Sequence, residues 1–86
     1  ALRRDFAEAM AQGDEAGDPA LDGLLKRHYD WVERTWKAPP SADAYAGLGR
    51  LYVANPEFKA LYDSSRPGLA EWMAEAMAAY ARRALG

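Results

Sequence analysis

Signals that end one helix and start the next recur along this chain, and they constrain its fold more than any other feature of the sequence. At two positions, a residue whose side chain can cap a helix is followed directly by proline. At a third position, a pair of prolines comes directly before such a residue. The cap oxygen pairs a free backbone N–H, and proline suits the first helical position because it has no N–H to satisfy. Between these signals apolar residues recur at intervals of three and four, and no segment alternates like a strand. The signals are Asp18-Pro19, Pro39-Pro40-Ser41 and Asn55-Pro56.

These helix-ending and helix-starting signals predict an all-α fold of about five helices in a single domain over residues 1–86. Gly13 stands where a left-handed residue would end the first helix. The run Asp63-Ser64-Ser65 is expected to break the fourth helix, and Pro67 to start the fifth. No linker is long enough to separate two domains. The helices are expected at residues 1–12, 19–37, 42–54, 56–63 and 67–84.

Two glycines, Gly47 and Gly49, lie inside the third predicted helix. Each costs up to about 1 kcal/mol relative to alanine in a helix interior. The close approach of a neighbouring helix or of a ligand would offset that cost. We therefore expect either a neighbouring helix or a ligand to approach this helix closely.

Charge and composition exclude several functions. The chain has 11 Lys and Arg against 13 Asp and Glu, a net charge of −2, so it lacks the basic surface that direct DNA or RNA binding needs. It has no apolar run near the ~18 residues of a membrane span and no signal-peptide pattern. It also has no cysteine, which excludes disulfides, thiolate zinc sites and thiol nucleophiles and indicates a reducing compartment.

Catalytic groups are scarce. His28 is the single histidine, so a triad with a histidine base or a multi-histidine metal site would depend on one residue. The three serines lie at predicted helix ends, where capping and turn formation explain them. Paired carboxylates such as Glu71 and Glu75 are typical of a solvated helix face. The sequence predicts a protein that is not an enzyme and has no metal site and no cofactor.

The second predicted helix carries an unusually wide apolar stripe with His28 at its centre. An imidazole on such a surface needs a hydrogen-bonding neighbour or solvent in a cleft. His28 is therefore either a satisfied core histidine or the polar orienting group of a ligand cleft. The stripe consists of Leu21, Leu24, Leu25, His28, Trp31, Val32 and Trp36, with Tyr29 at its edge.

The ten aromatic residues exceed what a core of this size needs. Phe58, Trp72 and Tyr45 are expected in the core, and Phe58, Leu61 and Tyr62 are expected to face inward from the fourth helix. Tyrosine and tryptophan can also line a cleft with one end in water, although for any single ring a core position is the alternative. The residues predicted to form a ligand cleft, with Trp31 the strongest candidate, are His28, Trp31, Tyr45, Tyr52, Tyr62 and Trp72.

Several motifs resemble a known family in the same order along the chain. They include AMAQG at the end of the first helix, HYDWV at residues 28–32, and the run YAGLGRLYVANPEFKALYDSSRPGLAEWMAEAM at residues 45–77. Together they resemble the TipAS antibiotic-recognition domain. This is the C-terminal effector domain of a branch of MerR-type transcriptional activators, the TipA and SkgA-like regulators.

The resemblance implies a reduced globin-like helical fold and a bacterial cytoplasmic setting. It implies a sensing domain excised from a longer regulator, whose MerR-type winged helix-turn-helix lies N-terminal and alone contacts DNA. The first predicted helix agrees, since Arg3 and Arg4 lie at the positive end of its dipole with no capping residue before them. The full-length regulator is expected to be a homodimer and the isolated domain a monomer. The N-terminal helix, residues 1–12, is expected to be mobile until a ligand packs against it.

The family's best-known members bind thiopeptide antibiotics in a hydrophobic cleft, some of them covalently through a cysteine. Because this sequence has no cysteine, the resemblance implies noncovalent binding of a hydrophobic small molecule. That molecule would be a thiopeptide-like antibiotic or another drug or stress-related inducer. The alternatives are a stand-alone drug-sequestering protein and a helical protein-interaction module.

Overall fold

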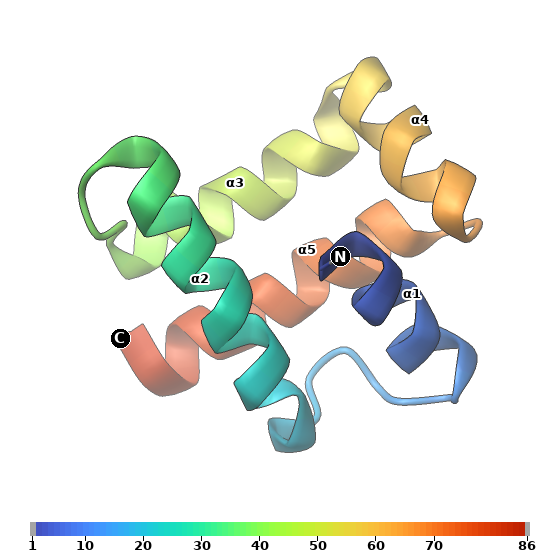
Figure 1. The fold of residues 1–86 in the computed structure, drawn as a ribbon, viewed down its shortest axis with the longest axis horizontal. Helices are drawn as coiled ribbons and strands as arrows, with labels where there is room; N and C mark the ends of the chain where they lie inside the picture. Colours follow the sequence, from blue (N-terminus) through green and yellow to red (C-terminus); the bar gives the residue numbers. More distant parts are fainter. Residues whose placement is uncertain (1, 86) are drawn as a thin grey trace.

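The computed structural model describes residues 2–85 and contains five α-helices with two short turns of other helical types (Figure 1). The part of the chain so described has no strand, which confirms the all-α prediction. The predicted first helix includes Ala1, which lies outside the described residues, as does Gly86. The elements are α1 (Leu2–Ala11), the 3₁₀ turn η1 (Pro19–Leu21), α2 (Asp22–Trp36), α3 (Ala42–Ala54), α4 (Pro56–Ser65), α5 (Leu69–Tyr80) and the π-helical turn η2 (Ala81–Leu85).

Two of the predicted capping residues act as expected, whereas Asp18 caps a 3₁₀ turn and the second helix begins at Asp22 and not at residue 19. The Ser41 hydroxyl accepts a hydrogen bond from the backbone N–H of Ala44 at the start of α3. The Asn55 side chain accepts from two backbone N–H groups at the start of α4. Asp18 caps η1, a single tight turn that precedes α2. Gly13 has a φ of +90°, the left-handed conformation expected after the first helix.

The boundary between α4 and α5 differs from the prediction. The helix α4 continues through the expected break to Ser65, and the Ser64 hydroxyl donates to the Leu61 carbonyl within it. The helix α5 begins at Leu69, two residues after Pro67, because Gly68 adopts a φ of +85° directly before it. Serine side chains that bond back to their own helix do not end it.

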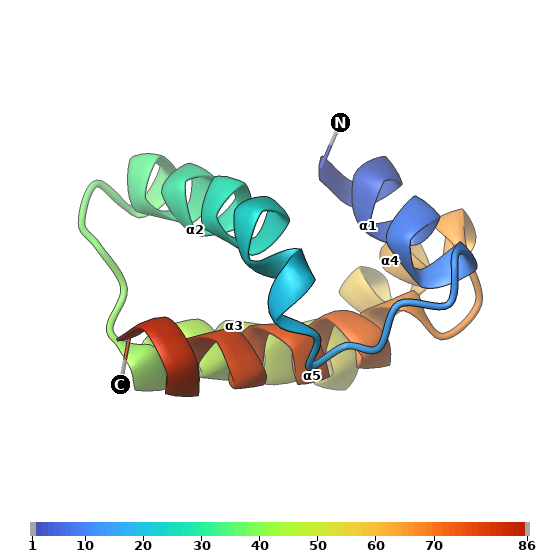
Figure 2. The same cartoon turned by 90° about the horizontal axis from the view of Figure 1, so that it is seen from below.

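The helices α3 and α5 lie side by side and form one layer of the domain (Figures 1 and 2). A Cβ atom placed on Gly49 of α3 would lie 3.0 Å from the Cα atom of Ala74 in α5. The predicted close approach is therefore confirmed at Gly49. At Gly47 an added Cβ would meet only the end of the Arg50 side chain.

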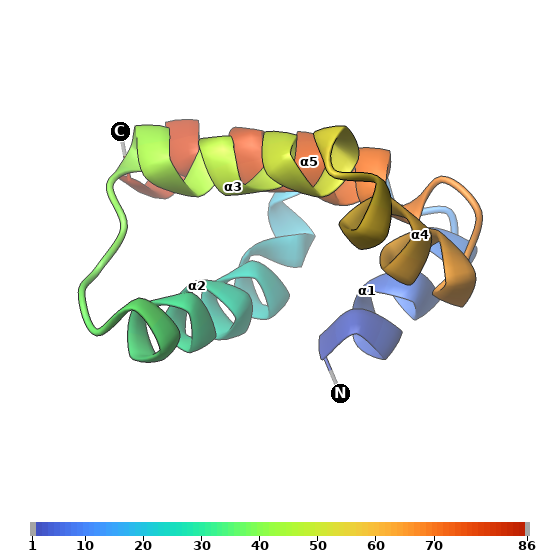
Figure 3. The ribbon, with the colours of Figure 1, turned by 90° about the horizontal axis from the view of Figure 1, so that it is seen from above.

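The helices α1 and α2 lie on the same side of the α3–α5 layer, and α4 lies at one end beside α1 (Figures 2 and 3). The Cα radius of gyration is 11.8 Å, close to the roughly 12 Å of a compact chain of this length. Within residues 2–85 no helix is both long and apolar enough to cross a membrane. The largest fully buried side chains are those of Phe6, Leu25, Val32, Tyr45, Leu69, Met73 and Met77.

The helix α4 is less buried than its sequence pattern predicts. Phe58 and Leu61 were expected to face inward, but they are 38% and 45% exposed. Because α4 packs at the end of the domain, only one row of its side chains is partly buried. That row contains Lys59, Tyr62 and Asp63, all partly buried. Phe58 keeps an edge-to-face contact with Tyr52, with ring centroids 5.7 Å apart.

Candidate ligand-binding cleft

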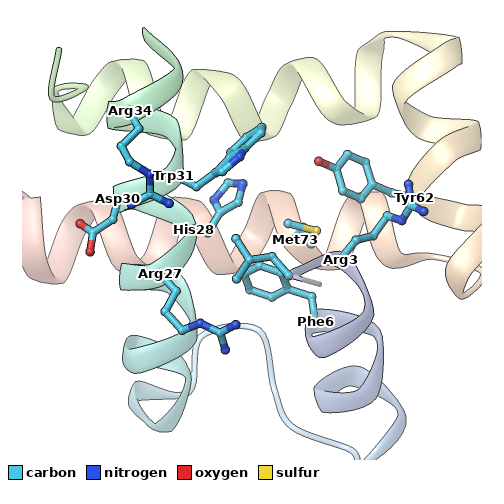
Figure 4. A pocket seen from close by; sticks show the side chains of 10 residues that line it. Arg3, Phe6, Arg27, His28, Asp30, Trp31, Arg34, Tyr62 and Met73 are labelled. Atoms are coloured by element: carbon cyan, nitrogen blue, oxygen red, sulfur yellow. The ribbon is translucent and has the colours of Figure 1, made fainter. Parts of the chain in front are cut away.

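A cleft of about 580 Å³ lies between α1 and α2, with α5 and α4 contributing one residue each (Figure 4). Ligand pockets for drug-sized molecules typically measure about 300–1,000 Å³, so its size suits such a molecule. Its apolar lining includes three aromatic side chains, a leucine and a methionine. Its lining consists of Leu2, Arg3 and Phe6 of α1, Arg27, His28, Asp30, Trp31 and Arg34 of α2, Tyr62 of α4 and Met73 of α5.

Trp31 forms part of the cleft wall and is 46% exposed. Its ring stacks beside His28, with centroids 6.0 Å apart and planes inclined by 27°. Trp36, on the same helix, is 45% exposed but does not line the cleft. The predicted stripe on α2 is therefore wider than the surface that α2 buries, since both of its tryptophans remain nearly half exposed.

His28 is buried, with 3% of its surface exposed, and both ring nitrogens have partners. Nδ1 lies 2.8 Å from the Tyr45 hydroxyl and Nε2 lies 3.3 Å from the Tyr52 hydroxyl. Burial lowers the pKa of His28 to about 4, so the ring is neutral at pH 7. His28 is the satisfied core histidine of the first alternative, and one side of it also reaches the cleft.

Tyr45 and Tyr52 lie behind His28, not among the residues that line the cleft. Both rings are buried, and burial raises the pKa of each hydroxyl above its usual value. They hold the imidazole from α3. Their direct contact with a ligand stays a prediction, and the structure gives them a supporting position.

Tyr62 lines the cleft, whereas Trp72 does not. The ring of Tyr62 packs against that of Tyr52, with centroids 4.5 Å apart. The indole N–H of Trp72 instead donates to the backbone carbonyl of Asp14, 3.1 Å away. Trp72 thus fastens the loop between α1 and α2 onto α5. Of the six residues predicted from the sequence, the structure brings His28, Trp31 and Tyr62 together at the cleft.

Sequence reasoning missed the charged rim of the cleft and its floor. The rim contains Arg3, Arg27, Arg34 and Asp30, and the floor contains Phe6 and Met73. A signal was present on α2, because residues 27, 30, 31 and 34 recur at the spacing of one helix face. The charged residues of that face were not recognised, because the apolar stripe, which shares Trp31 with it, is the stronger pattern.

Comparison with known proteins identifies the family. Residues 1–80 match the TipAS antibiotic-recognition domain. The chain belongs to this family. The TipAS domain described here is also 46% identical over 82 residues to the HTH-type transcriptional regulator SkgA from two strains of Caulobacter vibrioides. The alignment covers 95% of this chain and 32% of each relative, so the chain spans about a third of their length. No solved structure matches it.

The cleft of this TipAS domain is lined by few groups that could react with a ligand. Its lining includes no serine, threonine, lysine or cysteine that could act as a nucleophile. Its histidine is neutral and already hydrogen-bonded on both nitrogens. In the described residues, no group of three or more His, Asp or Glu side chains is placed to hold a metal ion. Aromatic walls with a few polar groups at the edge are typical of small-molecule recognition.

Proposed function

We propose that this domain is the ligand-sensing part of an HTH-type transcriptional regulator and holds a hydrophobic drug or stress-related small molecule in its cleft. The observation that carries the proposal is the half-exposed indole of Trp31 stacked on His28 in the cleft wall. A large aromatic side chain left half in water is available to stack on a ligand. The family description, antibiotic recognition, and the regulator relatives support the same function.

Binding is noncovalent in this proposal. The family resemblance includes members that capture a ligand through a cysteine, and this chain has none. The ligand is held by aromatic stacking on Trp31 and Tyr62 and by apolar contact with Leu2, in front of the buried side chains of Phe6 and Met73. Affinity then depends on shape and on the polar groups of the rim.

The proposed signal is a change in the position or order of α1. The cleft is built mainly from α1 and α2, which contact each other through the ion pair of Asp5 with Arg27 and the edge-to-face contact of Phe6 with His28. A ligand that contacts both helices binds the domain more tightly when α1 is docked against α2 than when it is not. It therefore shifts the population toward the docked state, by an amount set by the difference between the two affinities. An N-terminal DNA-binding domain of a cytoplasmic, homodimeric regulator would receive this change through α1. The net charge of −2 agrees with DNA contact elsewhere in the protein.

Paired tryptophan variants test the binding site. Trp31→Ala and Trp36→Ala remove rings of equal exposure from one helix, but only Trp31 lines the cleft. Calorimetric titration with a panel of thiopeptides and other aromatic antibiotics should show binding by the wild type and by Trp36→Ala. Trp31→Ala should bind about tenfold more weakly, the effect of a lost aromatic contact of about 1.4 kcal/mol. Equal affinity of the two variants, or no binding across the panel by the wild type, contradicts the proposal.

Experiments on the full-length protein distinguish regulation of transcription from sequestration of the drug. A sensor requires that an inducer which binds the domain also changes transcription from its promoter, and that Trp31→Ala weakens both. A protein that only sequesters the drug protects cells from it without altering transcription. The helical protein-interaction alternative predicts binding of a peptide and no change with any small molecule.

A further inference from the structure

We infer that the ligand of this cleft is an amphipathic aromatic anion, a flat apolar body with a carboxylate or sulfonate group. The inference rests on the proposed function and adds the charge of the ligand to it. It comes from an imbalance of charge at the rim. The whole chain has a net charge of −2, yet the cleft is lined by three arginines and one aspartate.

The two acidic side chains near the rim are already paired. Asp5 forms an ion pair with Arg27, and its Oδ2 atom lies 3.1 Å from a guanidinium nitrogen of Arg27. Asp30 is paired with Lys26 one turn earlier on α2, at 3.2 Å. These pairs leave no carboxylate of the rim to neutralise the other arginines.

Arg3 and Arg34 are the uncompensated charges. Within residues 2–85 neither forms an ion pair. Arg3 comes from α1 and reaches the cleft on the side of Tyr62, while Arg34 comes from α2 on the opposite side (Figure 4). An anion between them would be attracted from both walls. Like charges that line one cleft concentrate ligands of the opposite sign.

The remaining lining supplies no competing charge. His28 is neutral at pH 7 because burial lowers its pKa to about 4, and Phe6, Trp31 and Met73 are apolar or aromatic. A guanidinium group binds a carboxylate or sulfonate through two parallel hydrogen bonds and also stacks on aromatic faces. The arginines therefore select the charged group, and the rings select the flat body.

Two fluorescent probes with the same ring system measure this selection. Anilinonaphthalene sulfonate is anionic, and N-phenylnaphthylamine is its neutral counterpart without the sulfonate. We expect the anionic probe to bind the wild-type domain about tenfold more tightly, as two exposed ion pairs of about threefold each would give. Raising the salt concentration from about 50 mM to about 500 mM should weaken the anionic probe alone, because salt screens exposed charges.

Arginine variants assign the effect to the rim. Arg3→Gln and Arg34→Gln should each weaken the anionic probe about threefold, and the double variant about tenfold, with the neutral probe unchanged. Arg50→Gln is the matched control, because Arg50 is exposed on α3 and does not line the cleft. It changes the net charge equally and should alter neither affinity. Circular dichroism confirms that each variant is folded.

The outcomes distinguish the inferred preference for an anion from the proposed ligand-sensing function. If both probes bind equally, or if the rim variants bind the anionic probe like Arg50→Gln, the inference is wrong while an apolar cleft remains. If neither probe binds, or if Trp31→Ala weakens neither, the proposed function fails and the inference fails with it. A preference for the anion that disappears in the double variant supports both.

Discussion

The Nδ1 atom of His28 lies 2.8 Å from the hydroxyl oxygen of Tyr45 in the interior of the domain. On the other side of the ring, Tyr52 approaches Nε2 at 3.3 Å. A neutral imidazole has one N–H and one free nitrogen, so one hydroxyl accepts from the ring and the other donates to it. This pairing satisfies the buried imidazole of α2 through two residues of α3, and it requires the ring to stay uncharged.

Stability should therefore fall when the solution is acidified. The unfolded chain binds a proton at the ordinary histidine pKa of 6.5, whereas folded His28 does so near 4. Between these values the unfolded state holds more protons, so the free energy of unfolding decreases as the pH falls. The loss should reach about 2 kcal/mol between pH 7 and pH 5. Urea unfolding at several pH values measures it.

The control uses the fact that His28 is the single histidine. Its ring signals in an NMR titration of the native protein should change with a midpoint near pH 4 and not near 6.5. His28→Gln keeps one donor and one acceptor but has no proton to gain, so its stability should be nearly constant from pH 7 to pH 5. A midpoint above 6 would refute the neutral, buried assignment.

Two glycine substitutions on one helix should have opposite effects. Alanine at Gly47 meets only the flexible end of Arg50, so it should stabilise the domain by up to about 1 kcal/mol through helix propensity. Alanine at Gly49 would place its Cβ 3.0 Å from the Ala74 backbone. Because backbone cannot move aside cheaply, Gly49→Ala should cost about 1–3 kcal/mol. Chemical denaturation of both variants decides, and equal effects would show that α3 and α5 can separate.

The helix boundaries could largely be predicted from the sequence, because the signals that set them are local. Asn55 and Ser41 cap helices through atoms two or three residues away, so their effect can be recognised without knowing the tertiary structure. The inward face of α4 could not be recognised in this way. Phe58 and Leu61 have apolar spacing, but whether they are covered depends on which helices reach the end of the domain.

The candidate site shows the same division. The surplus of aromatic residues brought attention to Trp31 and Tyr62, whose types and spacing are visible in the sequence and which the structure places at the cleft. It could not separate the cleft wall from the layer behind it, so Tyr45 was grouped with them although it holds His28 from inside. Arg3 and Arg34 belong to helices distant in sequence, and only the packing of α1 beside α2 brings them to one rim.

Asp63 should be important for the junction between α4 and α5. Its Oδ1 atom accepts a hydrogen bond from the backbone N–H of Ala70, 3.1 Å away, which is the main reason that its pKa is lowered. Gly68, directly before α5, has no side chain to do this. Asp63→Ala should lower the Tm by about 5 °C.

Asp63→Asn separates the cap from the charge. Asparagine caps a helix about as well as aspartate but gives up the ion pair with Lys59, whose Nζ atom lies 3.2 Å from Oδ2. Thermal unfolding followed by circular dichroism should show a smaller decrease in Tm for Asp63→Asn than for Asp63→Ala. Equal decreases would assign the effect to the ion pair.

The helix α1 should open more easily than the rest of the domain. Of its ten residues only Phe6 and Ala9 are buried, whereas α5 buries seven of its twelve. Segments with little buried surface open locally at lower free energy. Amide hydrogens of α1 should therefore exchange at least about tenfold faster than those of α5, a difference of about 1.4 kcal/mol in opening free energy. Hydrogen exchange followed by NMR in the free domain measures both helices in one sample.

Adding anilinonaphthalene sulfonate at saturation tests whether this local opening is coupled to the cleft. Because Leu2, Arg3 and Phe6 of α1 line the cleft, a bound probe should slow exchange in α1 and leave α5 nearly unchanged, since a ligand stabilises the state that it binds. Trp31→Ala, which removes a ring from the α2 wall of the cleft, should reduce this protection. Protection of residues 2–11 equal to that of residues 69–80 in the free domain would contradict ligand-coupled ordering, because no opening would remain for a ligand to suppress.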